Sequence, residues 1–242
     1  MDRVKCVNAR LRELYKPCME RFRNSGPIYK KSAWPYLLCA SADYVDADFK
    51  IMVFGQETCG WGKLCDHAAC GAEVQTLMEE YDDFVKADGR SSPFWNLNRH
   101  LRNNLAERTS DRSLGWIYNN VVKLGRVSRA GCDEQIYQWM LQGFNVLRQE
   151  VEILQPDMLL CFSGPAYDHR LEALCGQFDV EEVAGGDALQ LCRLHFKDVA
   201  MPETYRCYHP GYLQRTGVYW DAIEVLDELL AQAVMQRPIA AR

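Results

Sequence analysis

Two loops of the sequence combine residue types that could break a covalent bond. The first follows the apolar run 49–54 and contains Glu57, and the second begins at His209, after the extended run 199–208. A carboxylate can orient a water molecule and stabilise a developing positive charge, as in glycoside hydrolysis. An imidazole can donate a hydrogen bond to a developing anion. Because α/β proteins bind ligands beyond the carboxyl ends of their strands, Glu57 and His209 are the candidate catalytic residues.

Each candidate also has a purely structural explanation. A glutamate at a strand end is often a surface carboxylate, and a histidine before a proline can hydrogen-bond within a turn. Asn119 and Asn120 form a common turn pair, and Leu213 could start the packing of the last helix. The joint placement of Glu57 and His209 at strand ends favours a functional site.

Two familiar motifs are incomplete in this chain. A phosphate loop requires G-x-x-x-x-G-K-[ST]. Gly55 and Gly60 have that spacing, but Trp61 stands where the lysine should be, which excludes this kind of triphosphate site. Ser163 lacks the first glycine of the G-x-S-x-G motif, so we interpret it as a turn residue rather than a nucleophile.

Four residues between the predicted strand 49–54 and the predicted helix 72–87 raise the question of zinc. They are Cys59, Cys65, His67 and Cys70. Structural zinc sites usually pair one C-x₂₋₄-C half with a second half, and this spacing is irregular and has no second half. Ordinary loop thiols and a surface histidine are the better interpretation, and we predict no metal and no cofactor.

Composition restricts the class of protein. The chain has 242 residues, 48% of them hydrophobic and 25% charged, and a formal net charge of −5. No stretch approaches the ~18 apolar residues of a membrane span, and the N-terminus lacks the apolar centre of a signal peptide. We therefore expect a cytoplasmic monomer that does not enter a membrane. The odd count of 11 cysteines favours reduced, mostly buried thiols.

Helical and extended patterns alternate along the chain. Helices are predicted near 1–24, 72–87, 92–105, 133–154 and 218–235. Buried or extended segments are predicted at 49–54, 116–118, 157–162, 189–196 and 199–208. The alternation predicts one α/β domain over 1–242, in which a central, mostly parallel sheet carries helices on both faces. The stretch at about 62–92 is interpreted as an insertion.

Four segments together resemble the uracil-DNA glycosylase superfamily. The segment 55–57 (Gly-Gln-Glu) resembles its water-activating motif, and 209–215 resembles its His-Pro-Ser loop, including a leucine four residues after the histidine. The segment 118–123 resembles its strand-end asparagine segment, and 92–96 resembles the turn before its next helix. The combination, over 49–220 and in the right order, carries the resemblance. It implies a uracil-DNA glycosylase-like fold, base flipping and base excision.

The resemblance also implies roles for single residues. Glu57 would orient the attacking water, and His209 would donate a hydrogen bond to the departing base. The residues implied to bind the base are Gln56, Cys59, Trp61, Asn119 and Asn120, with Asn120 favoured over Asn119 as the amide that reads the pyrimidine edge. The residues implied to contact DNA are Gly211, Leu213 and Arg215, with Leu213 as the wedge that enters the duplex.

Departures from the family pattern bear on the substrate. Glu57 replaces an aspartate, Thr58 replaces a proline, and Gly211 replaces a serine. The aromatic residue that shields the base pocket in the best-known family falls on Cys59, which leaves room beside the 5-position of a pyrimidine unless Trp61 fills it. We therefore expect a 5-substituted pyrimidine, such as a modified base of foreign DNA in antiviral defence, rather than uracil alone.

The distribution of charged residues along the chain is compatible with two other classes of function. The stretch Arg99–Arg129 is basic and Glu73–Asp88 is acidic, which permits a local phosphate-attracting surface on an acidic protein. A charge run can equally be a solvated helix face. The same fold could bind nucleic acid or a nucleotide without cleaving it, or Glu73–Asp88 could serve a protein-interaction module.

Overall fold

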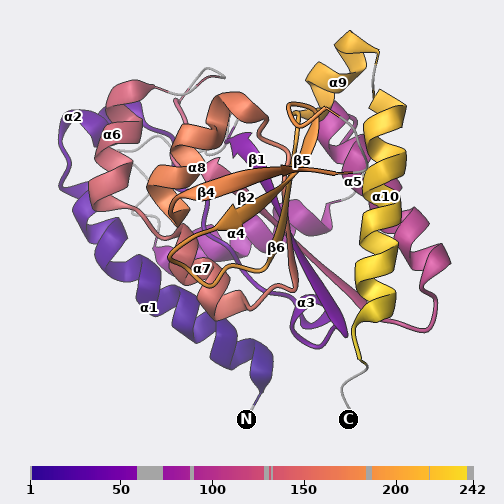
Figure 1. Cartoon of the computed structure of the whole chain (residues 1–242). Helices are drawn as coiled ribbons and strands as arrows, with labels where there is room; N and C mark the ends of the chain where they lie inside the picture. The colour runs from indigo at the N-terminus through magenta and orange to yellow at the C-terminus, as the bar shows by residue number, and fades with distance from the viewer. Residues whose placement is uncertain are drawn as a thin grey trace.

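The computed structural model shows an α/β fold built around one six-stranded sheet (Figure 1). It describes residues 2–58, 73–87, 90–127, 131, 133–183, 187–217 and 219–238. The strands are β1 (Phe49–Glu57), β2 (Leu114–Val122), β3 (Met158–Cys161), β4 (Phe178–Glu182), β5 (Leu191–Phe196) and β6 (Glu203–Cys207). Their order across the sheet is β2-β1-β3-β6-β5-β4.

The sheet is mostly parallel, as predicted. Strands β2, β1, β3 and β6 run in one direction, and β5 is antiparallel to β6 and to β4. The chain leaves β1 to form β2 on one side and then crosses to form β3 on the other side. This reversal makes the carboxyl ends of β1 and β3 a topological switch point, where α/β sheets bind their ligands.

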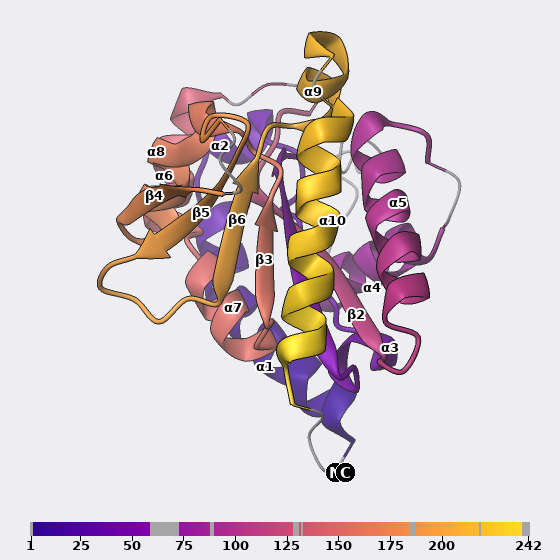
Figure 2. The same cartoon turned by 45° about the vertical axis from the view of Figure 1, so that its right-hand side comes forward.

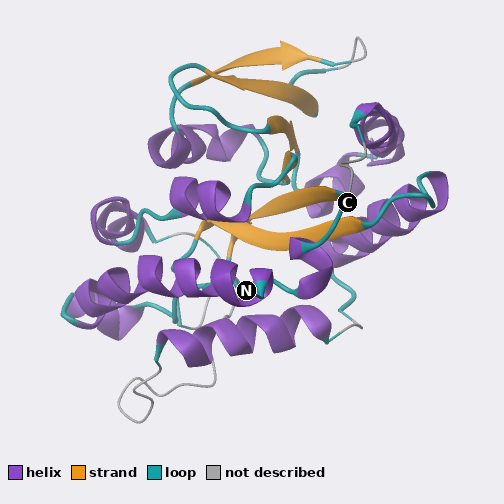
Figure 3. Ribbon diagram, turned by 90° about the horizontal axis from the view of Figure 1, so that it is seen from below, coloured by secondary structure: helices purple, strands orange, loops and turns teal. Residues whose placement is uncertain are grey.

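Helices cover both faces of the sheet (Figures 2 and 3). One face carries α1 (Arg3–Arg23), α2 (Pro27–Lys31), α3 (Ala42–Val45), α4 (Val74–Lys86), α6 (Glu134–Gly143), α7 (Leu147–Leu154) and α8 (Asp168–Cys175). The other carries α5 (Pro93–Arg108), α9 (Pro210–Thr216) and α10 (Tyr219–Gln236). A short 3₁₀ helix, Pro165–Tyr167, precedes α8.

Alternation along the strands divides the core into two layers. Ile51, Val53 and Leu160 face α5 and α10, whereas Met52 and Phe54 face the helices on the opposite side. Because successive side chains of a strand point to opposite faces, this parity also decides which faces the neighbouring Asn119 and Asn120 of β2 reach.

Several predicted helix boundaries are confirmed because capping residues mark them. Asp2 caps α1, which ends at Arg23, and the Ser92 hydroxyl accepts a hydrogen bond from the Trp95 N–H at the start of α5. The single helix predicted over 133–154 is wrong. Phe144 leaves the helical conformation with φ −144° and ψ 37°, so α6 ends before it and α7 begins at Leu147.

Two strand predictions also need correction. The strand predicted to stop at Gly55 continues to Glu57, and the asparagines predicted to follow a strand lie within β2, paired with β1. The strand β4, which was not expected from the sequence pattern, forms a hairpin with β5. No helix in the described part of the chain is long and apolar enough to cross a membrane.

Candidate functional site

Strand register brings the two candidate catalytic residues to the same edge of the sheet. Phe54, Cys161 and Arg206 form one row across β1, β3 and β6. Glu57 and His209 each lie three residues beyond that row, above the carboxyl ends of the parallel strands. Glu57 ends β1 and His209 follows β6, and only β3 lies between these two strands. The two strands are therefore two strand spacings apart, at about 4.8 Å for each spacing.

The Gln56 side chain joins the loops at the switch point. Its Nε2 donates to the Ser163 backbone oxygen at 2.7 Å, so it ties the end of β1 to the loop after β3. Gln56 therefore has a structural role in this state. Cys59 and Trp61, the other residues predicted near it, lie outside the described residues, as do Cys65, His67 and Cys70.

Glu57 is half-buried and only partly hydrogen-bonded. Its Oε1 accepts a hydrogen bond from the Gly131 N–H, while Oε2 is buried without a hydrogen-bond partner among the described residues. Burial raises the pKa of Glu57; the Gly131 hydrogen bond and the charges of Arg170 and Arg126 act in the opposite direction. The carboxylate thus has one buried oxygen that no described donor satisfies.

His209 caps α9 and keeps one ring nitrogen free. Its Nδ1 accepts a hydrogen bond from the Gly211 N–H at 3.2 Å. Burial lowers the pKa of His209, and the Arg215 charge lowers it further, so the ring is neutral at pH 7. A neutral ring that accepts at Nδ1 carries its proton on Nε2. This Nε2–H is a donor without a hydrogen-bond partner in the described part of the chain.

Phe94 and Asn120 lie on the same face of the sheet as His209. The Phe94 ring stacks on His209 with centroids 6.3 Å apart and an interplanar angle of 18°. Gly55 pairs with Asn120, and a Cβ at Gly55 would lie 2.5 Å from the Asn120 Oδ1 and 3.4 Å from the Phe94 ring. The absence of a side chain at Gly55 therefore makes room for the Asn120 amide. Among described residues this amide has no hydrogen-bond partner.

The contribution of Phe94 to this site is not predicted by the sequence pattern. Its helical spacing with Leu97 and Leu101 predicted a core residue, but Phe94 is only half-buried, whereas the other two are fully buried. The available signal was its place at the start of the helix, directly after Pro93, where a side chain can extend past the sheet edge.

Asn119 does not reach this face, which corrects its assignment to base binding. It points to the opposite side of β2, where its Nδ2 donates to the Glu150 Oε2 at 2.9 Å. Its Oδ1 accepts from the Lys123 Nζ at 2.9 Å and from the Asn120 N–H at 2.8 Å. Tyr15 completes this buried cluster through its hydroxyl, which donates to Glu150 Oε1. Strand parity explains the outcome, because neighbours in a strand face opposite ways.

Leu213 is fully buried, which corrects its assignment as the wedge that enters DNA. It packs in the core layer shared by α5 and α10, with 0% of its surface exposed. Its neighbour Tyr212 is 41% exposed and lies against Tyr208, with ring centroids 4.5 Å apart. Arg215 is exposed on the same short helix, with its guanidinium 5.9 Å from the Tyr212 ring centroid.

The two halves of the candidate site remain distinct in the structure. His209, Phe94 and Asn120 gather on the α5 face, whereas the charges that act on Glu57 come from Arg126 and Arg170. Within the described ranges no hydrogen bond or ion pair joins Glu57 to His209. The described residues hold no group of three or more His, Cys, Asp or Glu side chains that could bind a metal.

The sequence matches no protein-family model and no curated protein. The functional assignment therefore depends on the chemistry of these residues.

Seven cysteines fall within the described residues, and all seven are free thiols: Cys6, Cys18, Cys39, Cys161, Cys175, Cys192 and Cys207.

Proposed function

We propose that this chain is a DNA glycosylase that hydrolyses the N-glycosidic bond of a flipped-out pyrimidine. The observation that carries the proposal is the grouping of His209, Phe94 and Asn120 on one face. They supply a neutral hydrogen-bond donor, a flat apolar ring and a free amide, which are the contacts that a planar base with polar edges requires. Glu57 supplies the carboxylate at the same edge of the sheet.

The proposed reaction breaks the bond between the sugar C1′ and the base nitrogen. The Glu57 carboxylate orients a water molecule toward C1′ and stabilises the cationic sugar as the bond lengthens. The base departs as an anion, and His209 Nε2–H donates to its oxygen and stabilises that charge. Water adds hydroxide to C1′ and its proton passes to Glu57, while the released base takes a proton from solvent.

Recognition of the base would depend on Asn120. Its amide can present a donor and an acceptor together to a pyrimidine edge, and the Phe94 ring offers an apolar wall. Arg215 and the exposed Tyr212 lie on α9, beside His209, where they would contact the DNA backbone and the gap left by the flipped base. Extrusion of the base makes the target atom accessible.

A panel of modified oligonucleotides tests the proposal. We expect release of a 5-substituted pyrimidine, because Cys59 occupies the place of the shielding aromatic residue in the family that the sequence resembles. The panel compares uracil with 5-hydroxymethylated and glucosylated cytosine in one sequence context, and abasic sites are detected by strand cleavage in alkali. Brisk uracil release with none from any 5-substituted base would contradict the expected selectivity and implicate Trp61 as a gate. DNA binding without any base release would contradict the glycosylase proposal itself.

His209→Ala is expected to slow base release by at least ~10²-fold, the typical effect of losing one oxyanion donor. Single-turnover rates on the best substrate of the panel measure the loss without interference from product release. His195→Ala is the matched control, because His195 is an exposed histidine on β5 that pairs with Glu181. A rate within about twofold of the unmodified protein for His209→Ala would remove His209 from the proposed mechanism.

A further inference from the structure

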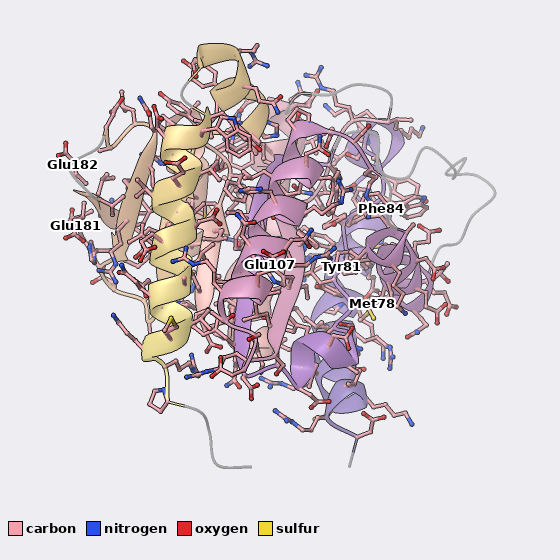
Figure 4. All side chains as sticks on the ribbon, turned by 90° about the vertical axis from the view of Figure 1, so that its right-hand side faces the viewer. Met78, Tyr81, Phe84, Glu107, Glu181 and Glu182 are labelled. Carbon is pink, nitrogen blue, oxygen red and sulfur yellow. The ribbon has the colours of Figure 1, made fainter. Side chains whose placement is uncertain are left out.

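A cavity lies at the outer edge of β2, between α4 and α5. Its volume is about 330 Å³, and its lining includes Tyr81, Trp95, Arg99, Arg102 and Trp116. Figure 4 shows Tyr81 and Phe84 on α4, beside the helix α5 that carries Glu107. Neither Glu57, Asn120 nor His209 lines this cavity. The cavity is therefore separate from the candidate site at the carboxyl ends of the parallel strands.

Backbone hydrogen bonding limits what the cavity can hold. The Ser113 backbone oxygen accepts a hydrogen bond from the Phe49 N–H of β1, and every second residue after Ser113 also faces β1. The residues between them, which include Trp116 and Tyr118, therefore direct their backbone N–H and C=O groups outward, toward the cavity. The Tyr81 hydroxyl accepts from the Tyr118 N–H at 3.1 Å and donates to the Tyr118 oxygen at 3.0 Å. Because this hydroxyl occupies both outward groups of Tyr118, an added peptide strand could not form a continuous ladder there. The cavity favours a small molecule.

The charges around the cavity favour an anion. Its lining contains four cations, Lys86, Arg90, Arg99 and Arg102, and two acids, Asp43 and Asp82. Lys86 is ion-paired with Asp82, and the lining as a whole carries two more cations than carboxylates. Guanidinium groups bind phosphate through paired hydrogen bonds, so such an excess is well suited to a phosphate group.

Two of these arginines are oriented by their neighbours. The Arg90 guanidinium lies 3.8 Å from the Phe84 ring centroid and 4.3 Å from that of Trp95. Arg99 donates to the Arg90 backbone oxygen at 2.8 Å. Arg102, by contrast, is exposed and forms no hydrogen bond or ion pair with the residues that the structure describes. It is the cation most available to a ligand.

Aromatic rings supply the remaining walls. Trp95 and Tyr118 lie with ring centroids 4.8 Å apart at 66°, and the half-buried Trp116 lies on the same strand as Tyr118. Flat ligands stack on such rings, and a volume of about 330 Å³ is at the small end of ligand pockets. We propose that this cavity binds a small phosphorylated molecule with an aromatic ring, of about the size of a nucleoside monophosphate.

Titration calorimetry with the full chain tests the proposal. The probes are adenosine 5′-monophosphate and uridine 5′-monophosphate, with the corresponding nucleosides and inorganic phosphate as comparisons. We expect a monophosphate to bind at least 10-fold more tightly than its nucleoside and than phosphate alone, since the arginines and the rings act on different parts of the ligand. Binding should weaken as salt rises.

Two variants locate the site. Arg102→Gln should weaken binding at least 10-fold, while its exposure keeps the fold intact, as circular dichroism would check. Arg108→Gln is the matched control, because Arg108 lies on the same helix but pairs with Glu228 outside the cavity. Lack of binding by either monophosphate at millimolar concentration would overturn the proposal, and so would equal binding by the Arg102→Gln variant. Binding of an acidic peptide in place of the nucleotides would also overturn it.

Discussion

Glu57→Gln is expected to reduce base release by about 10³-fold, within the range by which a positioned acid or base accelerates a reaction. The amide keeps the size of the carboxylate and can still accept the Gly131 hydrogen bond, so the local structure should persist. It cannot take a proton from water or stabilise a cationic sugar by charge. Single-turnover rates on the best substrate of the oligonucleotide panel measure the loss.

The pH dependence of the rate gives a second readout. Burial raises the pKa of Glu57, and only its carboxylate form orients water, so the rate should rise with pH through this raised pKa and then level off. Burial lowers the pKa of His209, which moves its protonation to lower pH and away from neutral conditions. The rising limb should disappear in the Glu57→Gln variant.

Thermal stability distinguishes a catalytic role from a structural one. A carboxyl group whose pKa is raised by folding stabilises the folded protein at low pH, and this contribution is lost as pH rises through the folded pKa. At pH 7 the buried charge of Glu57 is therefore unfavourable, and Glu57→Gln should keep or raise Tm. Glu107→Gln, an exposed change on α5, is the matched control for rate and stability. Unchanged turnover in Glu57→Gln, or a lower Tm, would contradict the catalytic assignment.

Much of the architecture could be predicted because the apolar runs and capping residues of single segments agree with the packing that a parallel sheet requires. Apolar runs marked β1 and β3, and capping residues marked the starts of α1 and α5. The alternation of strands and helices then predicted a parallel sheet, whose carboxyl edge carries Glu57 and His209. The break at Phe144 was not predicted, although the flanking Gly143 and Asn145 are residue types that favour helix ends.

The directions in which individual side chains point were harder to predict from the sequence than the order of helices and strands. Asn119 and Asn120 are identical in type and adjacent, and only strand register decides which of them faces Phe94. Leu213 and Tyr212 present the same difficulty, because one helical residue turns into the core while its neighbour stays exposed. Family resemblance assigns roles by position along the chain, whereas burial depends on residues far away in the sequence.

The cluster around Lys123 could not be predicted either, since a lysine in a basic stretch usually lies on the surface. Lys123 and Glu150 are both fully buried, and their side chains form an ion pair. Burial lowers the pKa of Lys123, and the attraction of Glu150 opposes this effect. The cluster also holds Asn119, which accepts a hydrogen bond from the Asn120 N–H, so it supports the strand that presents the Asn120 amide.

Lys123→Met is therefore expected to lower the free energy of unfolding by about 3–5 kcal/mol, because it leaves the Glu150 charge buried and uncompensated. Urea denaturation measures the loss. The double change Lys123→Met with Glu150→Met should cost less than Lys123→Met alone, since apolar side chains can replace a buried pair with little loss. Lys16→Met is the exposed control, with an expected effect below ~1 kcal/mol because its pair with Glu13 is solvated. A cost for Lys123→Met as small as that of the control would show that the Lys123–Glu150 pair does not stabilise the fold, and the cluster would then not be what holds β2 against α1 and α7.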